Sequence, residues 1–171
     1  MLLPSRLISL RWCLGERTVF ITIRAWSKDP DTGQWRRGSK APRLDGWQQI
    51  TFEDTQTPEY QRQFRADLRN GCGIGVIFGP ASDNLVGLDI DRDEEVARFL
   101  ALNPRFKDTF RTKGRRGCTF WVRVIGPYPA KRIVCKTEVA EWRGGGGGTN
   151  RSWTAFTPSA AGLIRSWSCD R

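Results

Sequence analysis

The sequence predicts an α+β fold (an α/β sandwich) in which helices pack on a mainly antiparallel sheet. Strand-like apolar segments alternate with two amphipathic helical patterns in the order β-α-β-β-α-β-β. A short turn, "PASD", separates the two central strand segments, which favours antiparallel neighbours because a helical crossover needs many more residues. With 171 residues, 39% of them hydrophobic, the chain is long enough for one domain with a core.

The first strand is expected at residues 17–26, where "RTVFITIRAW" alternates in polarity and is rich in β-branched residues. A loop rich in Gly, Pro, Asp and Ser follows. The first helix is expected to begin after Thr57, a good N-cap residue, with Pro58 at its first position. It should end at Asn70 and Gly71. Its buried stripe has apolar residues at i, i+4 and i+8: Tyr60, Phe64 and Leu68.

The rest of the folded part is expected to hold four strands and a second helix. The strands are expected at residues 73–79, 84–90, 118–126 and 132–142, and the helix from Glu94 to Leu102, stopped by Asn103 and Pro104. Five glycines at 144–148 then introduce a polar tail. We therefore expect a folded domain over residues 1–143, and a glycine-rich linker and atypical tail over residues 144–171.

Composition excludes several classes of site. The chain has no histidine, which removes Ser-His-Asp and Cys-His catalysis, and its five cysteines form no C-x-x-C pair that would indicate zinc. No apolar run is long enough to cross a bilayer, and charged residues interrupt the apolar start of the chain, so we expect a cytoplasmic protein with no membrane contact. The net charge is +10, yet residues 51–100 carry ten acids against five bases. An acidic island between basic segments suits a cation site that serves a polyanionic substrate.

Two carboxylates at the end of an apolar strand segment are the first candidate site. Asp89 and Asp91 are two residues apart, so both side chains should lie on one face of the strand and repel each other. A bound cation would neutralise them, and Mg²⁺ favours such oxygen ligands. The alternative is a solvated strand end that leads into the acidic start of the next helix, where carboxylates favour the helix dipole.

A third carboxylate is expected from another strand. Glu141 ends the apolar segment "VCKTEVAEW", whereas Glu138 has an odd offset from it and should lie on the opposite face. Three acids from separate strands can hold two metal ions about 4 Å apart for in-line attack on a phosphoryl group. The alternative for Glu141 is a surface acid paired with Arg143.

A basic loop, "RTKGRRG", precedes the strand expected at 118–126. Its glycines let a backbone approach phosphate closely, and Lys113, Arg115 and Arg116 would neutralise a triphosphate or a nucleic-acid backbone. The alternative is a solvated hairpin. The chain has no G-x-x-x-x-G-K-[ST] motif, so it holds no P-loop ATPase.

Four motifs in this order resemble the bifunctional DNA primase/polymerase domain of the archaeo-eukaryotic primase superfamily, found mostly in plasmid, phage and mobile-element replication proteins. They are "KAPRLDGWQ", "GCGIGVIFGP" with "NLVGLDID", "GRRGCTFWVRV" and "VAEWRGGG", and they span about Lys40 to Arg143. The resemblance implies an RRM-like catalytic module with a small N-terminal α/β unit. It also implies that Asp89 and Asp91 are the metal-binding pair and Glu141 the third acid, and that Lys40 belongs to the nucleotide- or DNA-binding set.

The family's middle motif carries a histidine that contacts the phosphates of the incoming nucleotide. Thr119 stands at the matching position here, and it donates one hydrogen bond but carries no charge. The resemblance then implies that Arg115, Arg116 and Arg123 compensate for the missing histidine.

The expected function is therefore metal-dependent nucleotidyl transfer, as a DNA primase or DNA polymerase, with Mg²⁺ or Mn²⁺ as cofactor. The expected partners are a DNA template and primer, a (d)NTP, and a helicase or ATPase on another chain or in a lost C-terminal region. The rival function is a catalytically weak or inactive nucleic-acid-binding replication module, because an RRM-like sheet can bind single strands by stacking and charge alone.

The tail "TNRSWTAFTPSAAGLIRSWSCDR" departs from the family, whose members continue after the glycines with a hairpin that carries a His-Pro turn. One hypothesis is a reading-frame slip in the glycine tract, with the C-terminal part of the domain lost. The alternative is ordinary divergence, with residues 157–159 forming the turn directly.

Overall fold

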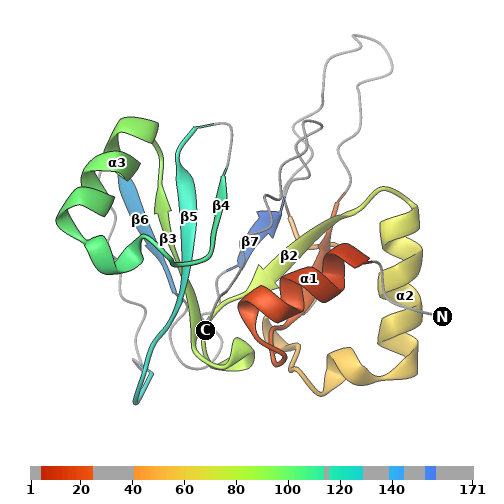
Figure 1. Ribbon diagram of the computed structural model, residues 1–171. Helices are drawn as coiled ribbons and strands as arrows, with labels where there is room; N and C mark the ends of the chain where they lie inside the picture. Colours follow the sequence, from red (N-terminus) through yellow and green to blue (C-terminus); the bar gives the residue numbers. More distant parts are fainter. Residues whose placement is uncertain (1–4, 25–40, 114–115, 129–138, 145–152, 157–171) are drawn as a thin grey trace, which may run out of the picture.

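The computed structural model describes residues 5–24, 41–113, 116–128, 139–144 and 153–156. These residues form an α+β fold with two antiparallel sheets, a three-stranded one in the order β1-β2-β7 and a four-stranded one in the order β4-β5-β3-β6. Figure 1 shows α1 and α2 beside the three-stranded sheet and α3 beside the four-stranded sheet. The predicted fold class, with a mainly antiparallel arrangement, is confirmed.

The three-stranded sheet is built around β2 (Gly73–Ile77), which pairs with β1 (Phe20–Ile23) on one edge and β7 (Trp153–Phe156) on the other. All four residues of β1 are buried because both of its faces are covered. Phe20 packs into a cluster with α1 (Ser5–Leu14) and α2 (Pro58–Arg69), whereas Ile21 packs into a second cluster with Ile50 and Ile77.

Helix α2 begins as the sequence predicts. The Thr57 hydroxyl accepts a hydrogen bond from the Tyr60 N–H, and Pro58 takes the first helical position. The predicted stripe faces the core: Phe64 is buried, Tyr60 and Leu68 pack beside it, and the Tyr60 hydroxyl donates to the Phe20 carbonyl at 2.7 Å.

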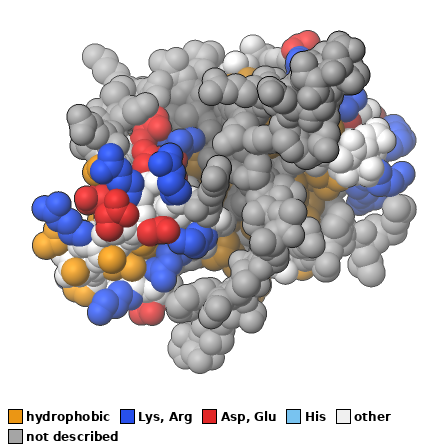
Figure 2. Space-filling model, turned by 90° about the horizontal axis from the view of Figure 1, so that it is seen from above, with side chains coloured by type: hydrophobic (Ala, Val, Ile, Leu, Met, Phe, Trp, Pro, Cys, Tyr) orange, Lys and Arg blue, Asp and Glu red, His pale blue; other side chains and the backbone are white. Residues whose placement is uncertain are grey.

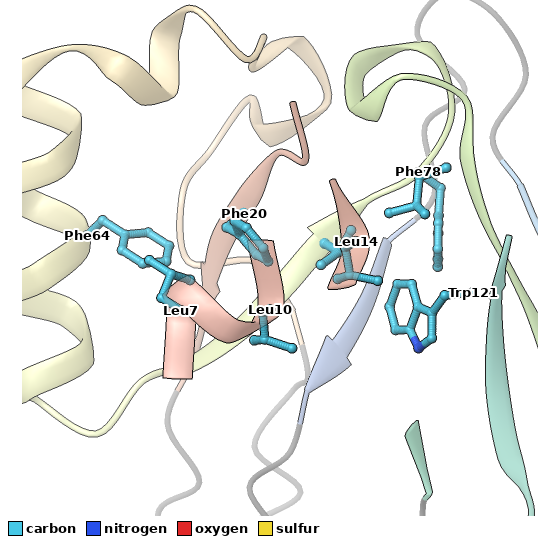
Figure 3. Packing of buried hydrophobic residues seen from close by; sticks show 9 residues of the cluster. Leu7, Leu10, Leu14, Phe20, Phe64, Phe78 and Trp121 are labelled. Carbon is cyan, nitrogen blue, oxygen red and sulfur yellow. The ribbon is translucent and has the colours of Figure 1, made fainter. Parts of the chain in front are cut away.

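A continuous apolar cluster joins the two sheets. Figure 3 shows Leu14 between the residues near α2 and the pair of Phe78 and Trp121, whose rings are tilted by 33° with their centroids 5.5 Å apart. Because Trp121 belongs to the four-stranded sheet and Phe20 to the three-stranded one, this cluster fixes the two sheets relative to each other.

The four-stranded sheet holds the strands expected to carry the site. Its members are β4 (Arg111–Lys113), β5 (Cys118–Arg123), β3 (Leu85–Ile90) and β6 (Ala140–Arg143). Helix α3 (Asp93–Leu102) covers one face of this sheet, where Ile90, Cys118 and Phe120 pack against Val96 and Phe99. The opposite face carries Leu85 and Trp121, which pack in the cluster that joins the two sheets, and polar side chains toward the end of β3.

The prediction that the two central strands are neighbours in one sheet is wrong. Strands β2 and β3 lie in different sheets, and only a single bridge, Gly79 to Leu85, links them. Gly79, Asp83 and Asn84 have φ angles of 88°, 54° and 58°, so the chain turns sharply between the two strands. Each strand then finds partners on both of its edges within its own sheet.

Three elements were not predicted: α1, β4 and β7. Strand β7 falls within the predicted tail, and residues 157–171 lie outside the described part, so the reading-frame hypothesis stays a prediction. Within the described residues, no helix combines the length and the apolar character that crossing a membrane requires.

Candidate active site

A row of polar side chains crosses the four-stranded sheet near the end of β3. Thr119 on β5 and Glu141 on β6 are the direct partners of Asp89. Directly opposed residues on neighbouring strands put their side chains on the same face of a sheet. Three residues predicted from separate parts of the sequence therefore lie together, with Asp89 in the middle.

Asp89 is held by two donors from its neighbouring strands. The Thr119 hydroxyl donates a hydrogen bond of 2.7 Å to Asp89 Oδ1, and Arg143 Nη2 lies 2.6 Å from Asp89 Oδ2. The Asp89 side chain is 21% exposed, so its carboxylate is partly withdrawn from water but still reachable. Both oxygens have fixed partners, which orients the carboxylate group.

Arg143 is the cation that joins the two acids of the row. The same nitrogen, Nη2, lies 3.4 Å from Glu141 Oε2. Like charges on directly opposed residues destabilise a sheet, so a cation between Asp89 and Glu141 offsets their repulsion. The alternative of a Glu141–Arg143 pair is thus observed, but Arg143 lies closer to Asp89.

The sheet surface at Gly87, beside the row of polar side chains, is closely packed. Gly87, two residues before Asp89, is the direct partner of Arg143, so it lies on the same face. A Cβ atom at Gly87 would come within 2.9 Å of the Phe78 ring and 3.1 Å of the Thr119 methyl group. Glycine is therefore needed here so that the aromatic ring can approach β3, and the site is bounded by an apolar wall.

Asp91 does not join the other two acids in this structure. It lies exposed beyond the end of β3, and its backbone N–H donates to the Val139 carbonyl at 2.9 Å. Among the described residues, no group of three His, Cys, Asp or Glu side chains is placed to hold a metal ion. Asp89 and Glu141 fit a divalent cation in their chemistry, since their hard oxygen ligands already converge on one positive charge.

Lys113 lies on the other face of the sheet. It is the direct partner of Cys118, whose side chain packs toward α3, and its ammonium group is 2.6 Å from Asp93 Oδ1 at the start of that helix. The Lys113 hydrogen bond, and secondly the Gly117 backbone N–H, lower the pKa of Asp93. Lys113 thus secures the loop to α3 in this structure, instead of facing Asp89.

Arg123 shares the face of Asp89 but is occupied by backbone groups. Its guanidinium donates to the carbonyls of Leu14 and Ser82 and reaches the Asp83 carboxylate at 2.8 Å. These contacts join the end of α1 to the turn before β3. The structure therefore gives Arg123 a role in holding the two sheets together.

The other predicted cations are only partly described. Arg116 is exposed in the loop between β4 and β5, whereas Lys40 and Arg115 lie outside the described residues. From the same motif as Lys40, Arg43 reaches the buried Asp67 of α2 at 3.3 Å. Figure 2 shows acidic and basic side chains intermixed over α3 and the adjoining end of the four-stranded sheet.

Arg143 was not predicted as a residue of the site. The signal was available, because Arg143 follows Glu141 by two residues on the same strand, and that offset places both side chains on one face. Gly117 was also missed as a specific constraint: a Cβ atom there would lie 1.7 Å from the Ile90 carbonyl oxygen. The loop between β4 and β5 is thus pressed against the end of the strand that carries Asp89.

Most of the chain matches a known family. The sequence model of the family described as bifunctional DNA primase/polymerase, N-terminal, matches residues 8–160 of the chain. The match begins within α1 and ends beyond β7, so it includes both sheets. No curated protein matches the chain.

Proposed function

The chain belongs to the bifunctional DNA primase/polymerase family, and we propose that it extends a DNA primer with (d)NTPs, or makes a primer de novo, in a metal-dependent reaction. A DNA primase/polymerase-type function has DNA and nucleotides as its substrates. The observation that carries the proposal is the row of Thr119, Asp89 and Glu141 across three strands.

The residues of the row would share the work as follows. Asp89 and Glu141 would hold Mg²⁺ or Mn²⁺, and Asp91, which lies apart from them in this structure, would have to turn toward the ion to add a third carboxylate. A divalent ion held there would neutralise charge on the phosphate groups of the nucleotide. Thr119 orients the Asp89 carboxylate through its hydroxyl, and the apolar wall formed by Phe78 limits water on one side of the row.

For the phosphate groups of the nucleotide and of DNA, our candidates are Lys40, Arg115 and Arg116. Lys113 and Arg123 are bound to other groups of the protein, so a role for either would require those contacts to open. We also propose a replication protein of a plasmid, phage or mobile element, with helicase activity supplied by another chain.

Two observations favour a second candidate, a nucleic-acid-binding module with little or no catalysis. Thr119 replaces a histidine that the resemblance leads us to expect, and Arg143 neutralises the two carboxylates without a metal. A sheet with basic surroundings can still bind single-stranded nucleic acid.

Extension of a labelled primer on a DNA template separates the two functions. The wild type, Asp89→Asn and the matched control Asp108→Asn, which removes an exposed acid outside the row, are compared with Mg²⁺, with Mn²⁺ and without metal. Incorporation that needs metal and is lost only in Asp89→Asn supports the enzyme. Binding of the primer-template without any incorporation supports the second candidate.

A further inference from the structure

The guanidinium of Arg143 lies where two carboxylates meet. One of its nitrogens, Nη2, contacts Asp89 Oδ2 at 2.6 Å and Glu141 Oε2 at 3.4 Å. The three side chains are 32%, 21% and 26% exposed in the order Arg143, Asp89, Glu141, so the group is shielded from solvent but not sealed. A single positive charge shared by two carboxylates is the arrangement that a bound metal ion would otherwise provide.

The sheet directs Arg143 to this position. Its direct partner on β3 is Gly87, which has no side chain to obstruct it, and Asp89 is the diagonal neighbour on the same face. A long side chain spans such a diagonal. The arrangement is imperfect for the guanidinium, however, because Arg143 Nε is buried and finds no hydrogen-bond partner among the described residues.

We propose that Arg143 is a built-in counter-ion that occupies the cation position between Asp89 and Glu141, and that it swings out when a divalent ion binds. This inference rests on the metal dependence in the proposed function and adds a residue that competes with the metal. The unpartnered Nε favours exchange, because the guanidinium loses no hydrogen bond there when it leaves.

Competition between Arg143 and the metal ion determines how much Arg143 weakens metal binding. When a site is open only part of the time, the apparent dissociation constant rises by the inverse of the open fraction. Charge-assisted pairs between partly exposed groups are of modest strength, so the open fraction is on the order of one tenth. Removing the guanidinium should therefore tighten metal binding about tenfold.

Loss of any nearby positive charge would also favour a cation, so the control must remove a charge outside the row. Arg98 on α3 serves, since it is 74% exposed and belongs to the helix that covers the opposite face of the sheet. Asp89→Asn serves as the background for ions that bind elsewhere, such as at the acidic start of α3.

The first measurement is the affinity for Mn²⁺ alone, by electron paramagnetic resonance, in wild type, Arg143→Gln, Arg98→Gln and Asp89→Asn. We expect about tenfold tighter binding in Arg143→Gln, little change in Arg98→Gln, and loss of this site in Asp89→Asn. Equal affinity in wild type and Arg143→Gln overturns the proposal, even if primer extension proves metal-dependent.

The second measurement follows Arg143 itself in the wild-type protein. The Nε–H resonance of Arg143 is followed by nuclear magnetic resonance in the wild type while Mg²⁺ is added, with Arg143→Lys used to assign the signal. The proposal predicts a saturable shift and faster exchange with water. An unmoved Arg143 signal, alongside shifts at the Asp89 and Glu141 amides, means that metal binds without displacing the arginine and refutes the proposal.

These outcomes are distinct from failure of the proposed function. If neither wild type nor Arg143→Gln binds Mn²⁺ at this site, the counter-ion proposal fails together with the metal site. If Mn²⁺ displaces Arg143 but no primer is extended, the counter-ion proposal stands and the catalytic one fails.

Discussion

Replacing Gly117 with alanine should both destabilise the protein and disturb the candidate site. Gly117 has φ +65° in the loop between β4 and β5, and its N–H donates to Asp93 at 3.0 Å. An added Cβ would lie 1.7 Å from the Ile90 carbonyl oxygen and 2.7 Å from the Asp91 carbonyl carbon. Both contacts are with backbone, so they cannot be relieved by turning a side chain.

The cost has a conformational part and a steric part. A left-handed conformation costs a residue with a Cβ roughly 1–2 kcal/mol. Real Cβ atoms stay beyond 3.0 Å, so the loop must withdraw from β3 by more than 1 Å, and such overpacking costs roughly 1–3 kcal/mol. The sum is about 2–5 kcal/mol. For a domain of this size, we expect that loss to lower Tm by about 10 °C.

Gly46→Ala is the matched control. Gly46 has a similar φ, +70°, but no atom lies within 4 Å of the position that its Cβ would take. Urea unfolding should therefore show a loss of about 1–2 kcal/mol for Gly46→Ala and a clearly larger loss for Gly117→Ala. Equal losses would mean that the loop does not press on β3, and would refute the reasoning.

Three smaller predictions follow from single contacts. Thr119→Val removes the hydroxyl that orients Asp89 and should lower nucleotide incorporation about tenfold or more with only a small change in Tm; unchanged incorporation would remove Thr119 from the site. Lys113→Met should raise the pKa of Asp93, as followed by carbon nuclear magnetic resonance. In the wild type the lowered pKa of Asp93 stabilises the folded state at any pH above the pKa of this group in the unfolded chain. That stabilisation is lost as the pH falls through the pKa of the group in the folded state. Arg123→Met should destabilise by about 1–3 kcal/mol in urea unfolding, because it removes the hydrogen bonds from the guanidinium to the Leu14 and Ser82 carbonyls, of which the Leu14 carbonyl keeps the Thr18 hydroxyl as a donor. A loss of DNA affinity without loss of stability would contradict its structural role.

Local signals in the sequence predicted local structure well. Helix α2 was expected from its cap and its stripe, and the structure has the same cap, because N-capping and first-turn proline act within a few residues. Helix α1 was missed although Leu7, Leu10 and Leu14 form a buried stripe, because Arg6 and Arg11 interrupt the apolar start of the chain. Strand β4 has three residues, too few for an alternating pattern to be recognised.

The arrangement of strands depended on contacts that are distant in the sequence. The short turn at residues 80–83 predicted antiparallel neighbours, but tertiary pairing put β2 and β3 in different sheets. The register of strand pairing also determines which residues share the site. A site with Asp89 and Glu141 together could be proposed from their residue types. The position of Lys113 on the opposite face, however, follows only from its pairing with Cys118. The sequence alone did not supply that register.

The most direct test of the central claim, that Asp89 and Glu141 act as one unit in nucleotidyl transfer, is single-turnover incorporation of one dNTP in the presence of Mn²⁺. Asp89→Asn, Glu141→Gln and the double variant are compared with wild type. Each single variant should lose about a hundredfold or more, and the double should lose no more than the worse single variant, because residues that act together are not additive. Full activity in Glu141→Gln, or losses that multiply in the double variant, would contradict the account.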